Sequence, residues 1–289
     1  MKKALIIKLL LGCAILCFCT PAFGGSEMTY RDLDEALRAG NKVKKIKIAH
    51  RGLETLPDIF DHFPELEILE LNHNNLKSIP LSVFKCKKLK VLNLFQNELE
   101  TIPEEIGHLI NLEELSLSYN NLEFLPETIG RLAHLKTFNI RGNQLKTLPL
   151  SIGHLTKLED FRFSDNAVER IPNTIVNCQQ LDRLDACRNR LESIPAEIGR
   201  LKKLRFLYLA HNMIKELPES IGECTRLQEL DVVRAGILRM PFSLAGNMWL
   251  EHVFIDDRTQ SFYPNPKIKS WQEIHVIPSG NQSFYRIAE

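Results

Sequence analysis

The sequence predicts an α/β solenoid, in which similar coils stack side by side and each coil contributes one short strand. The chain has 289 residues, of which 44% are hydrophobic and 25% charged, and this content suffices for a long apolar core. Its clearest regularity is a proline that recurs at one constant interval, as is typical of solenoids. We expect about nine full coils and one degenerate coil over residues 43–264. The prolines in register are Pro57, Pro80, Pro103, Pro126, Pro149, Pro172, Pro195, Pro218 and Pro241, and Pro264 follows at the same interval.

Apolar residues share this period and define a short strand in each coil. Leu115 and Leu117 lie two positions apart, so both point inward from a strand, whereas Glu114 and Ser116 point outward. One coil alone buries too little apolar surface to offset the entropy lost in ordering its backbone, so the coils must stack. Two of the apolar columns are Leu66, Leu89, Leu112, Leu135, Leu158, Leu181, Leu204 and Leu227, and Leu71, Leu94, Leu117, Ile140, Phe163, Ala186, Leu209 and Val232.

An asparagine follows each predicted strand at a fixed position. Its short amide can bond backbone groups of the bend and of the next coil, where the sheet supplies no partner. We therefore expect a structural asparagine ladder along the solenoid. Its members are Asn74, Asn97, Asn120, Asn143, Asn166, Asn189 and Asn212.

The repeat resembles a known motif. The pattern L-x-x-L-x-L-x-x-N-x-L is matched by Leu112, Leu115, Leu117, Asn120 and Leu122. Together with the L-P-x-x-I-G-x-L continuation, it resembles the leucine-rich repeat superfamily, in the 23-residue class of Ras-suppressor-like proteins and exported bacterial proteins. The resemblance implies a right-handed β-α superhelix with its parallel sheet on the concave face. It also implies a helical or 3-10 return on the convex side and protein binding by the concave face.

The first 24 residues resemble a cleavable signal peptide. A basic start is followed by an apolar run over residues 9–18 and by a small-residue pattern suited to cleavage after Gly24. The chain is therefore expected to be exported to the periplasm, the cell surface or the medium, with no integral membrane span, because the apolar run is too short to cross a bilayer. Lipid anchoring at Cys13 is an alternative.

Both ends of the solenoid are expected to carry caps. Residues 25–42 predict a capping helix with a capping-box-like start over residues 29–32, and Tyr30, Leu33 and Leu37 share one helical face before Gly40 ends it. At the other end, residues 265–289 form a predicted C-terminal tail. Its strand-like segment, residues 271–277, is expected to cover the last coil.

The sequence favours no catalytic chemistry, and we expect neither a metal nor another cofactor. It lacks the common nucleophile-elbow, metalloprotease and phosphate-loop motifs. His50 and His73 are neighbours in one outward column, but no third metal ligand accompanies them. Cys187 is expected to face outward as a tolerated small residue, with a reactive thiol as the alternative. The core cysteines, which replace leucine, are Cys86, Cys178 and Cys224.

Charged residues on the concave face are predicted to pair across neighbouring coils. Exposed pairs of this kind fix strand register and contribute little binding energy. With a formal net charge of +1 the chain also has no global field for nucleic acid, so we expect no nucleic-acid partner. The expected pairs are Asp160 with Arg183, Arg162 with Asp185, and Asp165 with Arg188.

Exposed aromatic residues are the better candidates for partner binding, because buried aromatics anchor most interfaces. One expected cluster comprises Phe206, Tyr208, Phe254, His252, His211 and Val233. A second comprises Ile68, Val91, Phe95 and Tyr119, beside Arg141, which we expect to be unpaired. Alternatively, the C-terminal tail, which carries Trp271 and Phe284, folds back over the first cluster.

These observations predict an exported, non-enzymatic module, expected to be a monomer, that presents a rigid concave surface to a protein or peptide. Two alternatives stay open. One is an intracellular Ras-suppressor-like signalling scaffold, and the other is a surface adhesion or glycan-binding module.

Overall fold

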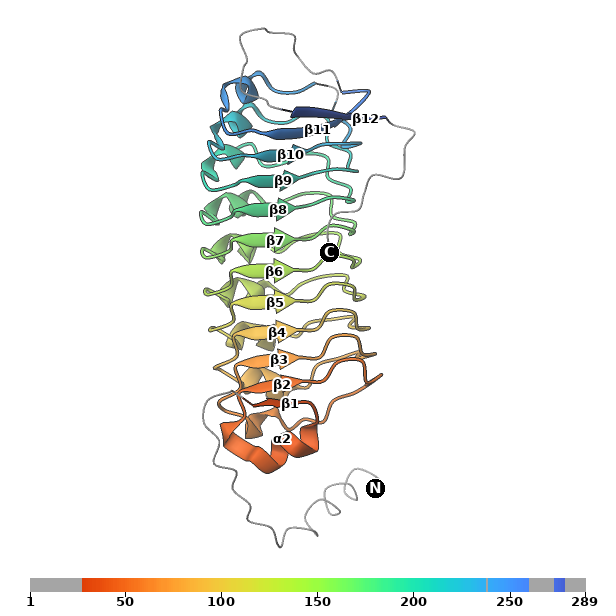
Figure 1. Ribbon diagram of the computed structural model, residues 1–289, viewed down its shortest axis with the longest axis vertical. Helices are drawn as coiled ribbons and strands as arrows, with labels where there is room; N and C mark the ends of the chain where they lie inside the picture. Colours follow the sequence, from red (N-terminus) through yellow and green to blue (C-terminus); the bar gives the residue numbers. More distant parts are fainter. Residues whose placement is uncertain (1–27, 238, 260–272, 279–289) are drawn as a thin grey trace, which may run out of the picture.

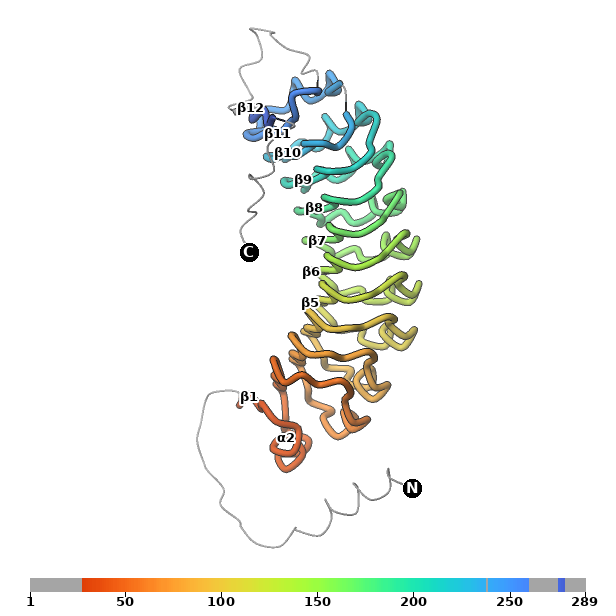
Figure 2. Tube along the Cα trace, turned by 90° about the vertical axis from the view of Figure 1, so that its right-hand side faces the viewer, coloured from red at the N-terminus to blue at the C-terminus, as the bar shows by residue number. Residues whose placement is uncertain are grey.

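The structure is a computed structural model that describes residues 28–237, 239–259 and 273–278. Within these residues twelve strands form one parallel sheet in sequence order (Figure 1). Figure 2 shows that the stack is curved and that the strands line its inner, concave side. The predicted α/β solenoid is therefore confirmed. The strands are β1 (Thr29–Tyr30), β2 (Lys45–Lys47), β3 (Ile68–Glu70), β4 (Val91–Asn93), β5 (Glu114–Ser116), β6 (Thr137–Asn139), β7 (Asp160–Arg162), β8 (Arg183–Asp185), β9 (Phe206–Tyr208), β10 (Glu229–Asp231), β11 (His252–Asp256) and β12 (Glu273–Ile277).

Each coil returns through a 3-10 turn on the convex side. Strands β2 to β11 begin at one constant interval along the chain, and paired residues in neighbouring strands are separated by the same interval, as in the Leu92–Leu115 pair. The return, expected to be helical or 3-10, is therefore 3-10, and most turns begin directly after the recurrent proline, whose backbone is extended. The 3-10 turns are η1 (Gly40–Lys42), η2 (Phe60–His62), η3 (Leu81–Lys85), η4 (Glu104–His108), η5 (Glu127–Arg131), η6 (Leu150–His154), η7 (Asn173–Asn177), η8 (Ile198–Arg200), η9 (Glu219–Glu223) and η10 (Phe242–Gly246).

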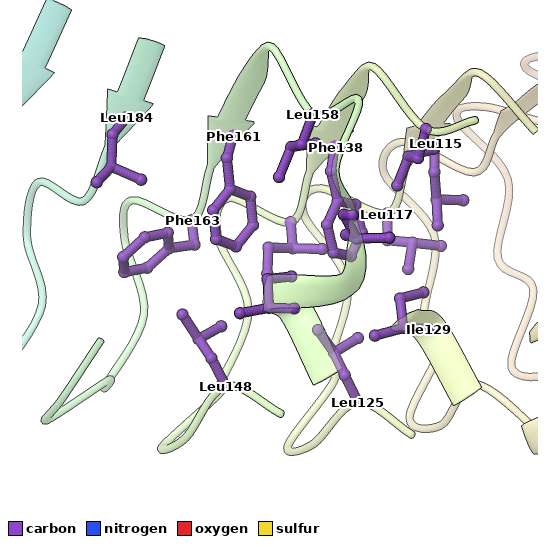
Figure 3. Close-up of a cluster of buried hydrophobic side chains, with 14 of the residues drawn as sticks. Leu115, Leu117, Leu125, Ile129, Phe138, Leu148, Leu158, Phe161, Phe163 and Leu184 are labelled. Carbon is purple, nitrogen blue, oxygen red and sulfur yellow. The ribbon is translucent and has the colours of Figure 1, made fainter. Parts of the chain in front are cut away.

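The inward side chains form one continuous core along the solenoid. Figure 3 shows Leu115 and Leu117 beside the larger Phe138, Phe161 and Phe163 of the following coils. The Phe138 and Phe161 rings stack with their centroids 5.5 Å apart, so aromatic residues replace leucine without breaking the period. Because each coil contacts mainly its neighbours, the core extends by one layer with each repeat.

The asparagine column bonds each coil to the one before it. The amide nitrogen of Asn143 donates to the Leu117 carbonyl at 3.0 Å and to its own coil's Ile140 carbonyl at 2.9 Å, while its oxygen accepts from the Leu122 N–H at 3.0 Å. The residue before the asparagine adopts a left-handed bend, as Tyr119 does at φ 54°. The remaining ladder residues make the same three kinds of bond, and they are Asn74, Asn97, Asn120, Asn166, Asn189 and Asn212.

Glycine in the convex turns lets neighbouring coils approach closely. A Cβ atom on Gly153 would lie 2.3 Å from the Thr174 carbonyl oxygen of the next turn, and one on Gly199 would lie 2.1 Å from the Ser220 oxygen. These separations leave no room for a side chain. Val176 takes the glycine position in η7, and the turn that follows, η8, is shorter than most of the others.

The N-terminal cap differs from the predicted helix. Thr29 and Tyr30 form strand β1, which pairs with β2, so Tyr30 reaches the core from the sheet. The helix α2 (Leu33–Ala39) is capped by Asp32, whose carboxylate accepts from the backbone N–H groups of Asp34 and Glu35. The predicted start at Thr29 is therefore wrong, because a strand pairing satisfies that backbone. Gly40 ends the helix with φ 64°.

The C-terminal tail contributes β12, which pairs in parallel with β11 along its whole length. A strand over the last coil was expected from the sequence. Trp271, Phe284 and Pro264 lie outside the described residues, as do the expected signal peptide, residues 1–24, and Cys13. Among the described residues, no helix is long and apolar enough to cross a membrane.

Candidate functional site on the concave face

The concave face is built from four outward columns of side chains. The first and third residues of each short strand point outward, and so do the two residues between the strand's last inward leucine and the asparagine. Because successive coils are in register, each column places side chains from neighbouring coils next to one another. A partner on this face would therefore contact several coils at once.

Charges in the middle of the face are largely satisfied internally. Arg162 donates to both carboxylate oxygens of Asp160, at 2.9 and 2.7 Å, and the Arg183 guanidinium lies 4.0 Å from the same carboxylate. The expected pair of Arg162 with Asp185 does not form, because Arg162 bends back along its own strand. The Asp185 carboxylate accepts from the Ser164 hydroxyl and from the Cys187 backbone N–H.

A second group of charges bridges three coils. The Arg141 Nε donates to Asp165 at 2.8 Å, and Arg188 lies 3.7 Å from the same carboxylate. The expected Asp165–Arg188 pair therefore forms. The expectation that Arg141 is unpaired is wrong, because its side chain reaches diagonally to Asp165 in the next column. Comparing the residues of a single column along the sequence does not reveal such a diagonal contact.

The aromatic row is the N-terminal part of the candidate site, and we define it as His50, His73, Phe95, Tyr119 and Arg141. The two imidazoles stack with centroids 4.1 Å apart, Phe95 meets His73 edge-on at 4.9 Å, and Tyr119 meets Phe95 at 5.5 Å. The Arg141 guanidinium carbon lies 5.5 Å from the Tyr119 ring centroid. The Tyr119 side chain is 43% exposed. Ile68 and Val91, which the sequence groups with this row, are half-buried and in register at the starts of β3 and β4, in a different outward column.

Phe206 and Tyr208 begin the C-terminal part of the site. The Arg183 guanidinium lies 4.5 Å from the Phe206 ring centroid and 5.3 Å from that of Tyr208, and it donates to the Tyr208 hydroxyl at 3.2 Å. Burial, together with the nearby Glu229, raises the pKa of Tyr208 to about 12. Both rings are half-buried, so this cluster is less exposed than expected.

A small apolar cluster explains this burial. Cys187, Ala210 and Val233 form it in one outward column, and Tyr208, Phe254 and Ile277 pack against it. Val233 is only 1% exposed, so its expected availability to a partner is wrong. Cys187 is 5% exposed, and this burial raises its pKa well above the usual range, so it is a small packed residue and the alternative of a reactive thiol is wrong. The large Tyr208 and Phe254 side chains therefore cover the small side chains of this cluster.

Asp231 lies between Tyr208 and Phe254 in the column of outward residues. Its side chain is 7% exposed and accepts from the Val233 backbone N–H at 3.0 Å. Burial is the main reason that the pKa of Asp231 rises to about 7, and the nearby Glu229 and Asp185 carboxylates add to the rise. A carboxylate between aromatic rings was not singled out from the sequence, although its neighbours in the same column, one coil away on either side, are both aromatic.

The histidines predicted for this site lie at its edges. His252 and Phe254 belong to β11, and the His275 ring of β12 stacks on Phe254 with centroids 4.6 Å apart. The His275 and His252 ring nitrogens are 3.4 Å apart. His211 is half-buried, and burial followed by Arg188 and Arg234 lowers its pKa. His275 and Ile277 were missed, because β12 departs from the spacing of the earlier strands.

The described residues offer little for metal or thiol chemistry. No group of three or more histidine, cysteine, aspartate or glutamate side chains within them could hold a metal ion. Their four cysteines are free and buried, and in the core positions Cys86, Cys178 and Cys224 the burial raises the thiol pKa to about 12. The arrangement suits contact with a partner surface.

Comparisons with known proteins agree with this geometry. A family model described as leucine-rich repeat region matches residues 115–205, and one described as leucine rich repeat matches residues 64–122 and 179–235. Together they span more than half of the chain. The comparison with curated protein sequences gave no match.

Several solved structures share the fold. A leucine-rich repeat protein of Leptospira interrogans is 26% identical, with a TM-score of 0.60 over 87% of this chain and 76% of that one. An internalin, InlF, of Listeria monocytogenes is 17% identical, with a TM-score of 0.70 over 84% of this chain and 69% of that one. The ectodomain of the Arabidopsis thaliana receptor kinase GASSHO1/SCHENGEN3 is 24% identical, with a TM-score of 0.69 over 74% of this chain and 28% of that one.

Proposed function

The chain belongs to the leucine-rich repeat family, and on that premise we propose that it is a non-catalytic binding protein that holds a protein or peptide against its concave face. One observation carries the proposal. Half-exposed aromatic side chains line both halves of the concave face, whereas most charges between them are paired within the chain. Aromatic rings are the side chains that contribute most to interfaces, and exposed paired charges contribute little.

The mechanism is rigid presentation. The strands and the asparagine ladder fix the backbone beneath every outward column, so binding orders few groups that were free before. The packed rings support this, because Tyr119 contacts Phe95 on one side and lies over the backbone of Gly142 on the other. An extended peptide or a protein edge laid along the stack would meet preformed contacts.

One neighbour's complex is consistent with this proposal. The Arabidopsis receptor ectodomain was solved in complex with CASPARIAN STRIP INTEGRITY FACTOR 2. This chain spans only 28% of that ectodomain, so the likeness is one of fold and does not identify a partner for this protein.

The experiment is selection from a random-peptide display library against the intact solenoid. We expect enriched peptides that lose binding to the Phe206→Ala/Tyr208→Ala or the Phe95→Ala/Tyr119→Ala variant. Phe124→Ala is the matched control, because Phe124 is 54% exposed and lies outside the concave columns. Circular dichroism must be unchanged in each variant. Peptides that bind all three variants as tightly as the wild type would place the binding surface elsewhere.

We also propose export, on the signal-like sequence of residues 1–24. Intact-mass analysis of the protein made in its native host is expected to give a chain that begins at Gly25. A chain that retains Met1 favours the intracellular scaffold, and a lipid-modified Cys13 favours a membrane-anchored form.

A further inference from the structure

We propose that the C-terminal half of the concave face binds a cationic side chain, a lysine or arginine of the partner. The site is the acidic-aromatic patch, which we define as Asp185, Tyr208, Glu229, Asp231 and Phe254. This inference rests on the proposed function and specifies the chemistry of the partner. It is carried by a contrast between acidic residues of the concave face: some have an arginine partner within the described residues, and those of the patch do not.

The two acidic residues of the β7 coil on the concave face, Asp160 and Asp165, have cationic partners. Asp160 is bonded by Arg162 and approached by Arg183, and Asp165 is bonded by Arg141. Within the described part of the chain, no lysine or arginine nitrogen lies within 4.0 Å of the Asp185, Glu229 or Asp231 carboxylates. These three carboxylates therefore have no ion-pair partner within that range.

The chain itself shows how a cation is held on this face. Arg183 lies over the rings of Phe206 and Tyr208, donates to the Tyr208 hydroxyl and approaches the Asp160 carboxylate. This is an arginine bound by two aromatic faces and one acid, and the attraction between a cation and a ring supports each contact. The acidic-aromatic patch shares the Tyr208 ring with this arginine site. Two coils beyond Arg183 in the same column, the residue is an acid, Glu229.

Asp231 lies at the centre of the acidic-aromatic patch. Its backbone is in register with Tyr208 on one side and Phe254 on the other, so its neighbours in the column are both aromatic. The Val233 N–H is the donor that the structure gives it. A buried carboxylate is costly unless it is paired. A cation from a partner would supply that pair and would also meet Glu229 and both rings.

Strand β12 and the histidines of β11 and β12 border the acidic-aromatic patch on its C-terminal side. His275 stacks on Phe254, and β12 carries Ile277 against the same apolar cluster. His252 is in register with Glu229 across the β10–β11 pair. Because the whole chain has a formal net charge of only +1, attraction of a cation is local to this patch and is not a property of the whole surface.

The test uses fluorescein-labelled oligoarginine as the probe, with oligoglutamine of equal length as the neutral control, and reads fluorescence anisotropy. The intact chain is expected to bind oligoarginine and not oligoglutamine. The Asp185→Asn/Glu229→Gln/Asp231→Asn variant is expected to bind oligoarginine about tenfold more weakly or worse. The amide oxygens of the two asparagines keep the acceptors for the Cys187 and Val233 N–H groups, and the amide nitrogen at position 185 can donate to the Ser164 hydroxyl.

The charge-matched control is Glu100→Gln/Glu104→Gln/Glu123→Gln, which removes three exposed acids outside the concave columns. It is expected to leave oligoarginine binding unchanged. If it weakens binding as much as the patch variant does, or if oligoarginine does not bind the intact chain, the inference is wrong. If the triple variant fails to fold, Glu229→Gln alone replaces it in the test, because the Glu229 side chain makes no backbone contact among the described residues. This single variant is also expected to bind oligoarginine more weakly than the wild type.

The display selection separates this inference from the proposed function. Enriched peptides should carry lysine or arginine, and they should lose affinity for the patch variant. Peptides without basic residues that still require Tyr208 would overturn the cationic specificity and leave concave binding standing. Peptides whose affinity is unchanged by every substitution on the concave face would overturn the proposed function itself.

Discussion

The side-chain amide of Asn143 shows how single residues hold this solenoid together. It bonds the backbone of two coils at a bend where no strand pairing is available, and the left-handed residue before it turns the chain toward that position. Losing the amide leaves two carbonyl groups and one N–H without this partner in a buried site. Burial makes such a loss more costly than the loss of an exposed hydrogen bond.

We expect Asn143→Ala to lower the free energy of unfolding by about 1–3 kcal/mol, measured by urea denaturation. Asn111→Ala is the control, because its exposed amide makes one hydrogen bond, to the Lys87 carbonyl at 2.8 Å. That control is expected to change stability by less than about 0.5 kcal/mol. Equal midpoints for the two variants would contradict a structural role for the asparagine ladder.

Asp231 predicts a pH dependence of opposite sign to that of an ion-paired carboxylate. Its folded pKa of about 7 lies above the usual value of 3.8, so the folded state binds the proton more tightly than the unfolded state. Stability from this group is present below the usual pKa of 3.8 and is lost as the pH rises through about 7. The charged and titratable groups around it are Asp185 on β8, Arg183 and Tyr208, Glu229 on its own strand, and His252 and His275 on β11 and β12.

We therefore expect Asp231→Asn to gain stability relative to the wild type as the pH rises from about 4 to about 8, by roughly 2–4 kcal/mol. Urea denaturation at several pH values measures this difference, and groups that do not interact with Asp231 cancel because both proteins contain them. Glu100→Gln, an exposed substitution, is expected to give no such trend. A difference between Asp231→Asn and the wild type that stays constant with pH would contradict the raised pKa.

Residue placement on the concave face was only partly predictable from the sequence. The period assigns Val233, Cys187 and Arg141 to outward columns, and the structure keeps them there. Their exposure and pairing depend on which neighbouring side chain folds over them, and that choice is set by rotamers and by diagonal contacts between columns. Spacing alone therefore fixes which way a side chain points and leaves its burial undetermined.

At the scale of elements, the convex turns depend on glycine where neighbouring turns touch. We expect Gly153→Ala to destabilise the fold by about 1–3 kcal/mol, because its Cβ would lie 2.3 Å from the Thr174 carbonyl oxygen. Gly246→Ala in η10 is the matched control, since nothing lies within 4 Å of its Cβ, and it is expected to be neutral or slightly stabilising. Thermal unfolding compares the two. Equal melting temperatures would show that the turns separate at little cost.

The elements that follow the period were predicted well, and those outside it were not. Strands β2 to β11 and the turns between them repeat one local sequence, so their structure follows from any single coil. At the N-terminus no repeat constrains the chain, and Thr29 and Tyr30 pair with β2 rather than begin a helix. An exposed sheet edge offers backbone groups that a nearby extended segment satisfies, and this long-range contact overrides the local helix signal.

At the scale of the whole molecule, stability and binding should follow nearest-neighbour contacts between coils. Deleting residues 116–138 removes one full repeat and joins Leu115 to Asn139, so the strand pattern, the asparagine ladder and the core columns continue in register. We expect this shortened chain to fold with a cooperative transition at lower stability. Oligoarginine binding should stay within about twofold of wild type, because the acidic-aromatic patch on β8 to β11 keeps all its neighbours.

The control deletion removes residues 116–137 and retains Phe138, which places two inward residues, Leu115 and Phe138, next to each other in one strand. Since successive residues of a strand face opposite sides, one of them must turn toward the concave face. This variant is expected to unfold at a lower temperature than the register-preserving deletion in circular dichroism. If both deletions behave alike, the coils are not interchangeable units. Loss of oligoarginine binding in a folded, register-preserving deletion would show that distant coils shape the acidic-aromatic patch.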